Sequence, residues 1–240
     1  MILAIETSHV QGEVALGEGE FPTVSALSPG LVHGRELQPK IAQVCEAAGT
    51  PPAALDLVAV SAGPGSYTGL RIGVATAKAI AWALGKPALA ISTLEAIAQN
   101  VTEPGPFVVI LDARRGACYC AEFQAREDAD GRVHIERQSA DRAVPFAELA
   151  DRLAAATRLL GEGAVGLPGA SAREILPAEW NLPRAAEVYR LARRRWRAVR
   201  DGQEPAPPEF GQPHLLVPFY LRPSQAEERS IDGVRPGRPA

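Results

Sequence analysis

The sequence predicts an α/β protein made of two related halves. Apolar runs of strand length alternate with stretches of helical periodicity, which is typical of sheets covered by helices. The run ILAIE, which ends at Glu6, and the run FVVILD, which ends at Asp112, are each followed by a polar turn, a glycine and an alternating strand. Such a plan, repeated roughly a hundred residues apart, indicates a duplication in which both hairpin tips face a common cleft. A chance match is the alternative, because strand, acid, turn and strand often follow one another.

The first half is expected to contain three antiparallel strands followed by alternating helices and strands. The first helix is expected over 35–48, where Leu37 and Ile41 belong to an apolar set at helical spacing. A later helix is capped by Ser92, with Glu95 at the capping-box position. The expected strands cover 2–6, 13–17, 21–27, 57–61 and 87–91, and the expected helices cover 35–48, 70–84 and 93–100.

The second half is less regular in its pattern. Its expected strands cover 107–112 and 117–123, its expected helices cover 146–156 and 184–200, and a linker over 201–213 leads to an extended apolar segment over 215–221. The chain is therefore divided into a first lobe over 1–104, a second lobe over 105–222 and a tail over 223–240. The tail has no periodic apolar pattern, so we expect it to be flexible.

The composition excludes several classes of protein. With 46% hydrophobic and 22% charged residues, the chain is ordinary for a globular protein rather than disordered or fibrous. A formal net charge of −3 lacks the basic excess of a stand-alone nucleic-acid-binding protein. No apolar run reaches the roughly 20 residues of a membrane span, and the N-terminus lacks the basic start of a secretory signal. The 3 cysteines are too few for a disulfide framework, so we expect a cytoplasmic protein with reduced thiols.

A glycine-rich loop, GPGSYTGLRIG over 63–73, joins an expected strand to the next helix. Glycines permit close backbone approach, and the following helix N-terminus presents free N–H groups that suit an anion. However, no Gly-Lys-Ser/Thr sequence closes a phosphate-binding loop, and Thr68 stands where the third glycine of a dinucleotide fingerprint belongs. We therefore favour a tight turn that delivers a packed helix over a nucleotide-binding loop. The hydroxyls of Ser66, Tyr67 and Thr68 have no assignable His–Asp pair to activate them.

The helix after this loop carries small residues at four-residue spacing, and the preceding helix carries an apolar stripe. A glycine inside a helix costs about 1 kcal/mol relative to alanine, which close approach of another element would compensate. That element is either the sheet of the same lobe or a helix of another subunit, and we favour a subunit interface. The small residues are Gly69, Gly73, Ala77 and Ala81, and the apolar ones are Leu37, Ile41 and Val44.

Two carboxylates, Glu6 and Asp112, each end an apolar strand. In a two-lobed cleft such a pair would hold Mg²⁺ through waters, whereas in the simpler interpretation each acid caps its own hairpin turn; both interpretations stay open. The 4 histidines are scattered, without the spacing of a zinc or iron site. His33, which precedes the first expected helix, is expected to make a surface or interface contact.

A cluster of arginines surrounds Trp196 in the last expected helix. These side chains would contact an RNA backbone, or they form a solvated helix face with cations favoured near the C-terminus, and we favour the second interpretation. The cluster comprises Arg190, Arg193, Arg194, Arg195, Arg197 and Arg200.

Several motifs together resemble the TsaB family. They are MILAIETS at the start, His33 followed by Leu37 and Pro39, SAGPGSYTGLRIGVATAKAIA, STLEAIA, LDARRGACYCAEF and, near the end, PFYLRP. The loop GPGSYTGLRIG is the most specific of them, since the related TsaD family has a distinct glycine loop. The region over 125–211 is only loosely similar. The resemblance implies an actin-like, ribonuclease H-like fold of the Hsp70 and sugar-kinase type, with two lobes built from duplicated mixed-sheet subdomains.

The resemblance also implies a part in making threonylcarbamoyladenosine in tRNA, at the adenosine just 3′ of the anticodon. A chain of this kind is expected to have no activity of its own and to act as a scaffold that pairs with TsaD. The ATPase TsaE engages that pair, isolated chains self-pair, and tRNA is contacted indirectly, with no membrane involved. The metal-binding His-x-x-x-His of TsaD is missing here, which supports this role.

The resemblance places the subunit interface on the first two helices. It leaves a vestigial nucleotide or Mg²⁺ cleft at Glu6, Thr7 and Asp112, with ATP or ADP and Mg²⁺ expected at the level of the complex and no metal bound by this chain. The alternative is an actin-like ATPase or a glycoprotease-type peptidase that acts on its own. The implied interface residues are His33, Leu37, Ile41, Val44, Gly69, Arg71, Gly73, Ala77 and Ala81.

Overall fold

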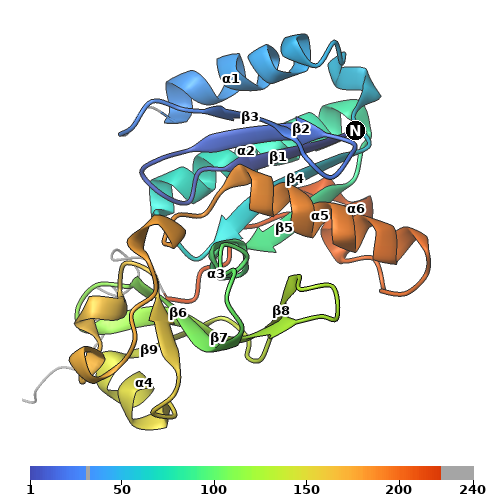
Figure 1. Ribbon diagram of the computed structural model, residues 1–240. Helices are drawn as coiled ribbons and strands as arrows, with labels where there is room; N and C mark the ends of the chain where they lie inside the picture. Colours follow the sequence, from blue (N-terminus) through green and yellow to red (C-terminus); the bar gives the residue numbers. More distant parts are fainter. Residues whose placement is uncertain (31–32, 223–240) are drawn as a thin grey trace, which may run out of the picture.

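The computed structural model describes residues 1–30 and 33–222 and contains two β-sheets with helices packed on and between them (Figure 1). The α/β class and the two mixed sheets predicted from the sequence are confirmed. The tail predicted over 223–240 lies outside the described residues. Within the described ranges, every helix is too short or too polar to cross a membrane.

The first sheet has the strand order β3-β2-β1-β4-β5. Its central strand β1 pairs antiparallel with β2 through a hairpin turn and parallel with β4 on the other edge. Because β4 and β5 are also parallel, a crossover must join them, and helix α2 does so. The strands are β1 (Ile2–Glu6), β2 (Glu13–Gly17), β3 (Thr23–Ala26), β4 (Leu57–Gly63) and β5 (Ala88–Ser92).

Both faces of the first sheet are covered by helices. Side chains alternate along β1, so Leu3 and Ile5 pack with α1 and α2 on one face, while Ile2 and Ala4 pack with α5 on the other. Helix α5, drawn in orange in Figure 1, comes from the C-terminal part of the chain and crosses back over this sheet. The helices are α1 (His33–Ala47), α2 (Tyr67–Leu84) and α5 (Ala185–Arg200).

The second sheet repeats the plan of the first. Strand β6 pairs antiparallel with β7 through a hairpin and parallel with β10, as β1 does with β2 and β4. This shared topology supports the duplication inferred from the sequence. Helix α3 lies between the two sheets and α4 packs on the far face of the second one. The elements are α3 (Thr93–Ala98), β6 (Gly105–Asp112), β7 (Ala117–Glu127), β8 (Val133–Arg137), β9 (Arg142–Pro145), α4 (Phe146–Arg152) and β10 (Arg158–Leu160).

Several elements differ from the sequence prediction. Helices α1 and α2 begin earlier than expected, α2 because the Ser66 hydroxyl accepts the Gly69 amide and caps the first turn. Helix α4 ends earlier than expected, and β8, β9 and β10 were not expected at all. The segment over 215–221, which was expected to be extended, starts in a 3₁₀ turn and continues from Leu216 without strand pairing, and its Phe219 amide donates to the Ala62 carbonyl at 2.7 Å. Short 3₁₀ turns lie at Pro52–Ala54, Ala164–Gly166, Ala170–Ala172, Ala178–Trp180 and Pro213–Leu215.

The predicted division of the chain at residues 104 and 105 falls between α3 and β6, where the chain passes from one sheet to the other. The expected linker over 201–213 contains a short helix, α6 (Pro208–Gly211), which packs near β5. Both α5 and α6 therefore lie on the first sheet, although they follow the second sheet in the chain.

Candidate functional site

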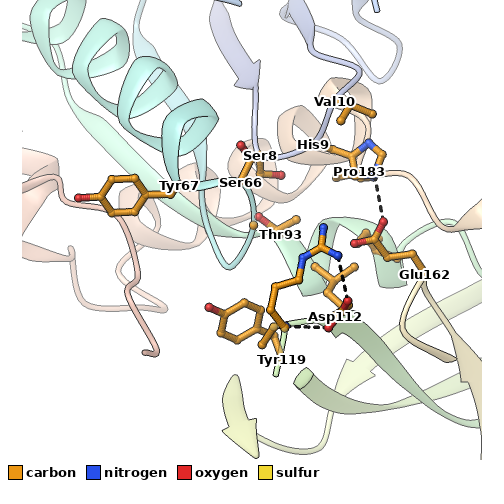
Figure 2. A pocket seen from close by; sticks show the side chains of 15 residues that line it. Ser8, His9, Val10, Ser66, Tyr67, Thr93, Asp112, Tyr119, Glu162 and Pro183 are labelled. Atoms are coloured by element: carbon orange, nitrogen blue, oxygen red, sulfur yellow. Dashed lines mark hydrogen bonds and ion pairs between the residues drawn. The ribbon is translucent and has the colours of Figure 1, made fainter. Parts of the chain in front are cut away.

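A cavity of about 390 Å³ lies where the two hairpin turns face each other (Figure 2). The β1–β2 turn contributes Ser8, His9 and Val10, and the β6–β7 turn contributes Asp112 and Arg114. The glycine-rich loop and α3 line the remaining sides. The common cleft predicted from the repeated plan is therefore present.

Glu6 lies beside this cavity but does not line it. Its side chain is fully buried, and the carboxylate accepts hydrogen bonds from the Ser8 amide and the Ser8 hydroxyl, each at 2.5 Å, and from the Ser61 hydroxyl. Burial raises the pKa of the Glu6 carboxyl, and the bonds from Ser61 and Ser8 oppose that rise. Glu6 therefore caps its own turn and ties that turn to β4.

Asp112 borders the cavity and also caps its own turn. One carboxylate oxygen accepts the Arg114 amide at 2.7 Å, and the other lies 3.3 Å from the Arg114 guanidinium. Thr7 is buried, and its hydroxyl donates to the Gly69 carbonyl at 2.8 Å. Of the three residues predicted for a nucleotide or Mg²⁺ cleft, only Asp112 faces the cavity. Over residues 1–30 and 33–222, no group of three or more His, Cys, Asp or Glu side chains could hold a metal ion.

A histidine–glutamate pair spans the cleft and was not anticipated from the sequence. His9 Nε2, in the β1–β2 turn, lies 3.5 Å from the carboxylate of Glu162, which follows β10. The hydrogen bond from His9 lowers the pKa of the Glu162 carboxyl. Thr93, at the start of α3, is buried against the same cavity, and neither its hydroxyl nor His9 Nδ1 has a hydrogen-bond partner in the described part of the chain. No sequence spacing signals these residues, because only folding brings them together.

The glycine-rich loop serves to seat α2 on the first sheet. A Cβ added at Gly69 would overlap the Thr7 carbonyl oxygen, and one added at Gly73 would overlap the Thr7 hydroxyl. Only glycine lets the helix approach the end of β1 this closely. The geometry supports the tight-turn interpretation of the loop.

The residues expected at a subunit interface lie, apart from Arg71, inside this chain. The apolar stripe of α1 and the alanines of α2 share one core with the first sheet. The His33 ring is also buried, with Nε2 3.3 Å from the Val10 carbonyl oxygen. The stripe therefore packs on the sheet of its own lobe, which is the other interpretation that the sequence left open. The buried set comprises His33, Leu37, Ile41, Val44, Gly69, Gly73, Ala77 and Ala81.

The outward face of α2 carries a different set of residues, of which the sequence prediction assigned only Arg71 to an interface. Tyr67 and Trp82, near its two ends, are 48% and 75% exposed. The Arg71 guanidinium lies over the Tyr67 ring, 5.2 Å from its centroid, and Tyr220 packs on the same ring at 5.4 Å. Small exposed side chains separate the two ends of this face. We define the outward face of α2 as Tyr67, Arg71, Ala75, Ala79 and Trp82.

Comparisons with known proteins agree with this architecture. The family model described as TsaD, tRNA N6-adenosine threonylcarbamoyltransferase, matches residues 26–163. The tRNA threonylcarbamoyladenosine biosynthesis protein TsaB of Bacillus subtilis (strain 168) is 30% identical over 253 residues, which cover 98% of this chain and 99% of that protein. The protein of the same description from Escherichia coli (strain K12) is 33% identical over 143 residues, covering 58% of this chain and 61% of that protein.

A solved structure from Pseudomonas aeruginosa, described as an uncharacterized protein with similarity to peptidase YEAZ, has the same fold. It superimposes with a TM-score of 0.73 at 24% sequence identity, covering 92% of this chain and 99% of that chain. The two-lobed, actin-like fold expected from the sequence is thereby confirmed.

Proposed function

Because the chain belongs to the TsaB family, we propose that it takes part in the synthesis of threonylcarbamoyladenosine in tRNA, as a non-catalytic subunit that pairs with a TsaD-type protein. The two TsaB relatives are described as proteins of this biosynthesis, and the matching family model is described as the transferase. In the proposed division of labour, the TsaD-type partner supplies the reacting groups and this chain supplies a docking surface.

The observation that carries the proposal is the outward face of α2. Trp, Tyr and Arg are the side chains most enriched among the energetic centres of protein interfaces. Tyr67 and Arg71 at one end of α2 and Trp82 at the other lie on the same exposed side of the helix. Ala75 and Ala79 between them would let a partner helix approach closely.

The exposed aromatic surface has a free-energy consequence. Trp82 is 75% exposed, and an aromatic side chain buries about 150–250 Å² when it is covered. At about 25 cal/mol per Å², covering Trp82 alone would contribute on the order of 3 kcal/mol before the cost of association. If Trp82 stayed exposed to water, this favourable free energy would not be realised.

The cleft supports a subunit without chemistry of its own. The Glu6 carboxylate is occupied by Ser8 and Ser61 and lies outside the cavity, and both Asp112 oxygens are engaged by Arg114. In the proposal, neither acid acts as a general base or a cation ligand.

A second copy of this chain is the occupant we propose for the same face when TsaD is absent. The homodimer and the pair with TsaD would then exclude each other. TsaE would engage the pair with TsaD rather than this chain alone.

The proposal is tested by Ala75→Arg, which places a long cation in the middle of the outward face. Pairing with the TsaD of the same organism, measured by light scattering after size-exclusion chromatography, should weaken at least about tenfold, because a buried unpaired charge costs more than about 1.4 kcal/mol. Threonylcarbamoyl transfer by the mixture should fall with it.

The matched control is Ala147→Arg, the same change at an exposed position of α4. Both pairing and transfer should stay at the native level in this variant. An Ala75→Arg chain with a native urea midpoint that still pairs normally with TsaD would contradict the proposed surface.

A further inference from the structure

The outer side of α5 presents arginines on the face of the first sheet opposite to α2. The helix buries an apolar side against this sheet, represented by Val188, Tyr189 and Leu191. Of its arginines, Arg190, Arg194, Arg197 and Arg200 are exposed, whereas Arg193 and Arg195 lie at the edges of the buried side and are partly covered. A partner on the outward face of α2 would leave this side of the molecule uncovered.

Three of these arginines are held by acids of the same chain. Arg195 binds the Glu95 carboxylate at 2.6 Å, and Arg194 lies 3.6 Å from its other oxygen. Arg190 pairs with Glu187 one turn earlier. Arg195 therefore ties α5 to α3, and this corrects the interpretation of the whole cluster as one uniform solvated face.

The other three, Arg193, Arg197 and Arg200, have no acid within ion-pair distance among the described residues. Arg193 Nε is buried without an acceptor in that same part of the chain. Burial raises the pKa of the Tyr189 hydroxyl, the nearby Arg193 and Arg197 oppose that rise, and Glu18 adds to it. Glu18 is itself paired with the N-terminal ammonium at 3.6 Å. At 1.5 Å per residue the three arginines span about 10 Å along one side of the helix. We call these three side chains the arginine row.

We propose that the arginine row binds the phosphate backbone of RNA. Guanidinium groups match phosphate oxygens with two parallel hydrogen bonds, which is why arginine predominates at such contacts. The chain as a whole carries a formal charge of −3, so the row is a local feature rather than a consequence of a basic protein. The identification of the RNA as the tRNA that the complex modifies rests on the proposed function.

An acidic protein segment is the competing partner for the row. Protein interfaces depend on buried aromatic anchors, which this side of α5 does not offer. Trp196 packs on the Phe210 ring at 5.2 Å between centroids, and Arg200 lies over it at 5.7 Å. The row is therefore a set of cations without an apolar centre, which favours a polyanion bound through electrostatic attraction over an acidic protein segment.

The test is the salt dependence of tRNA binding by the full chain, alone and with TsaD, measured by fluorescence anisotropy. Each phosphate contact contributes about 0.7–0.9 to the slope of log K against log salt. The triple variant Arg193→Gln, Arg197→Gln, Arg200→Gln should lower that slope by about 2–3 and weaken binding at low salt at least about tenfold.

A control variant removes the same charge elsewhere and should keep the native slope. Its substitutions, at exposed arginines of the second lobe, are Arg126→Gln, Arg132→Gln and Arg152→Gln. Urea midpoints are measured for both variants to exclude misfolding, because Arg193 is only partly exposed whereas the other five arginines lie at the surface.

Equal slopes for the native chain and the row variant would overturn the proposal, and so would tighter binding of polyglutamate than of tRNA at the same salt concentration. Pairing with TsaD is measured on the same samples. If the native chain and the triple variant have the same salt slope while pairing with TsaD is intact, the RNA contact is refuted and the proposed function is not. A retained slope difference in a chain that does not pair with TsaD supports the RNA contact and refutes the proposed function.

Discussion

Replacing Gly73 by alanine should destabilise the isolated chain, although the same change at an open helix position stabilises by about 1 kcal/mol. The new Cβ would overlap the Thr7 hydroxyl oxygen and lie 3.3 Å from Val60 Cγ2. The Thr7 hydroxyl is buried and donates to the Gly69 carbonyl at 2.8 Å. It cannot turn away from the new methyl group without leaving a buried donor unpaired.

The size of the effect follows from these contacts. Overpacking costs about 1–3 kcal/mol, and an unpaired buried hydroxyl costs about 1–3 kcal/mol more. The gain of about 1 kcal/mol in helix propensity offsets part of this loss. We expect the free energy of unfolding to fall by about 1–5 kcal/mol.

Urea denaturation followed by circular dichroism measures this loss. Thr7→Ala removes the obstructing hydroxyl, so Gly73→Ala should cost at least about 1 kcal/mol less in that background than in the native chain. Gly34→Ala is the control on α1, because among the described residues its new Cβ would meet only Ile72 Cδ1, at 3.7 Å, and it should be neutral or stabilising. A Gly73→Ala chain that is as stable as the native one but fails to pair with TsaD would refute the reasoning and return the small residues to a subunit interface.

Two further predictions concern buried carboxylates. The pKa of Glu6 is raised above its ordinary 4.5, so the folded chain holds this proton more tightly than the unfolded chain. Relative to Glu6→Gln, native stability should therefore fall as the pH rises from about 4.5 through the raised pKa, and a difference in urea midpoint that is constant with pH would contradict this. Glu95→Ala removes the buried acid shared by three partly exposed arginines and should cost about 1–3 kcal/mol in the same urea experiment. Glu148→Ala, in an exposed pair with Arg152, should cost less than about 0.5 kcal/mol. Equal losses would contradict the buried role of Glu95.

The strands and helices of the first lobe were predictable because each carries its own local pattern. The apolar run of β1 and the cap at Ser92 are read within a few residues, and the structure contains both. Strands β9 and β10 are only 4 and 3 residues long, which is too short for a period to be visible. They form because β7 and β6 offer them open edges.

The candidate site was less predictable, because its assignment depends on what covers each residue. Periodicity marks Leu37 and Ile41 as apolar, but it does not tell whether the sheet of the same chain or another subunit packs on them. Glu6 and Asp112 occupy equivalent strand ends, yet Ser61, which is 55 residues away in the sequence, draws only Glu6 away from the cavity. Once the buried side of a helix is known, helical periodicity gives its exposed side. That step would have identified Tyr67 and Trp82 as exposed residues of α2.

The outward face of α2 is tested most directly by photocrosslinking in the mixture with TsaD. A photoreactive amino acid in place of Ala79 should capture TsaD on irradiation, and the same group in place of Ala147 on α4 should not. Capture from position 147 without capture from position 79 would contradict the assignment of this helix face to the partner.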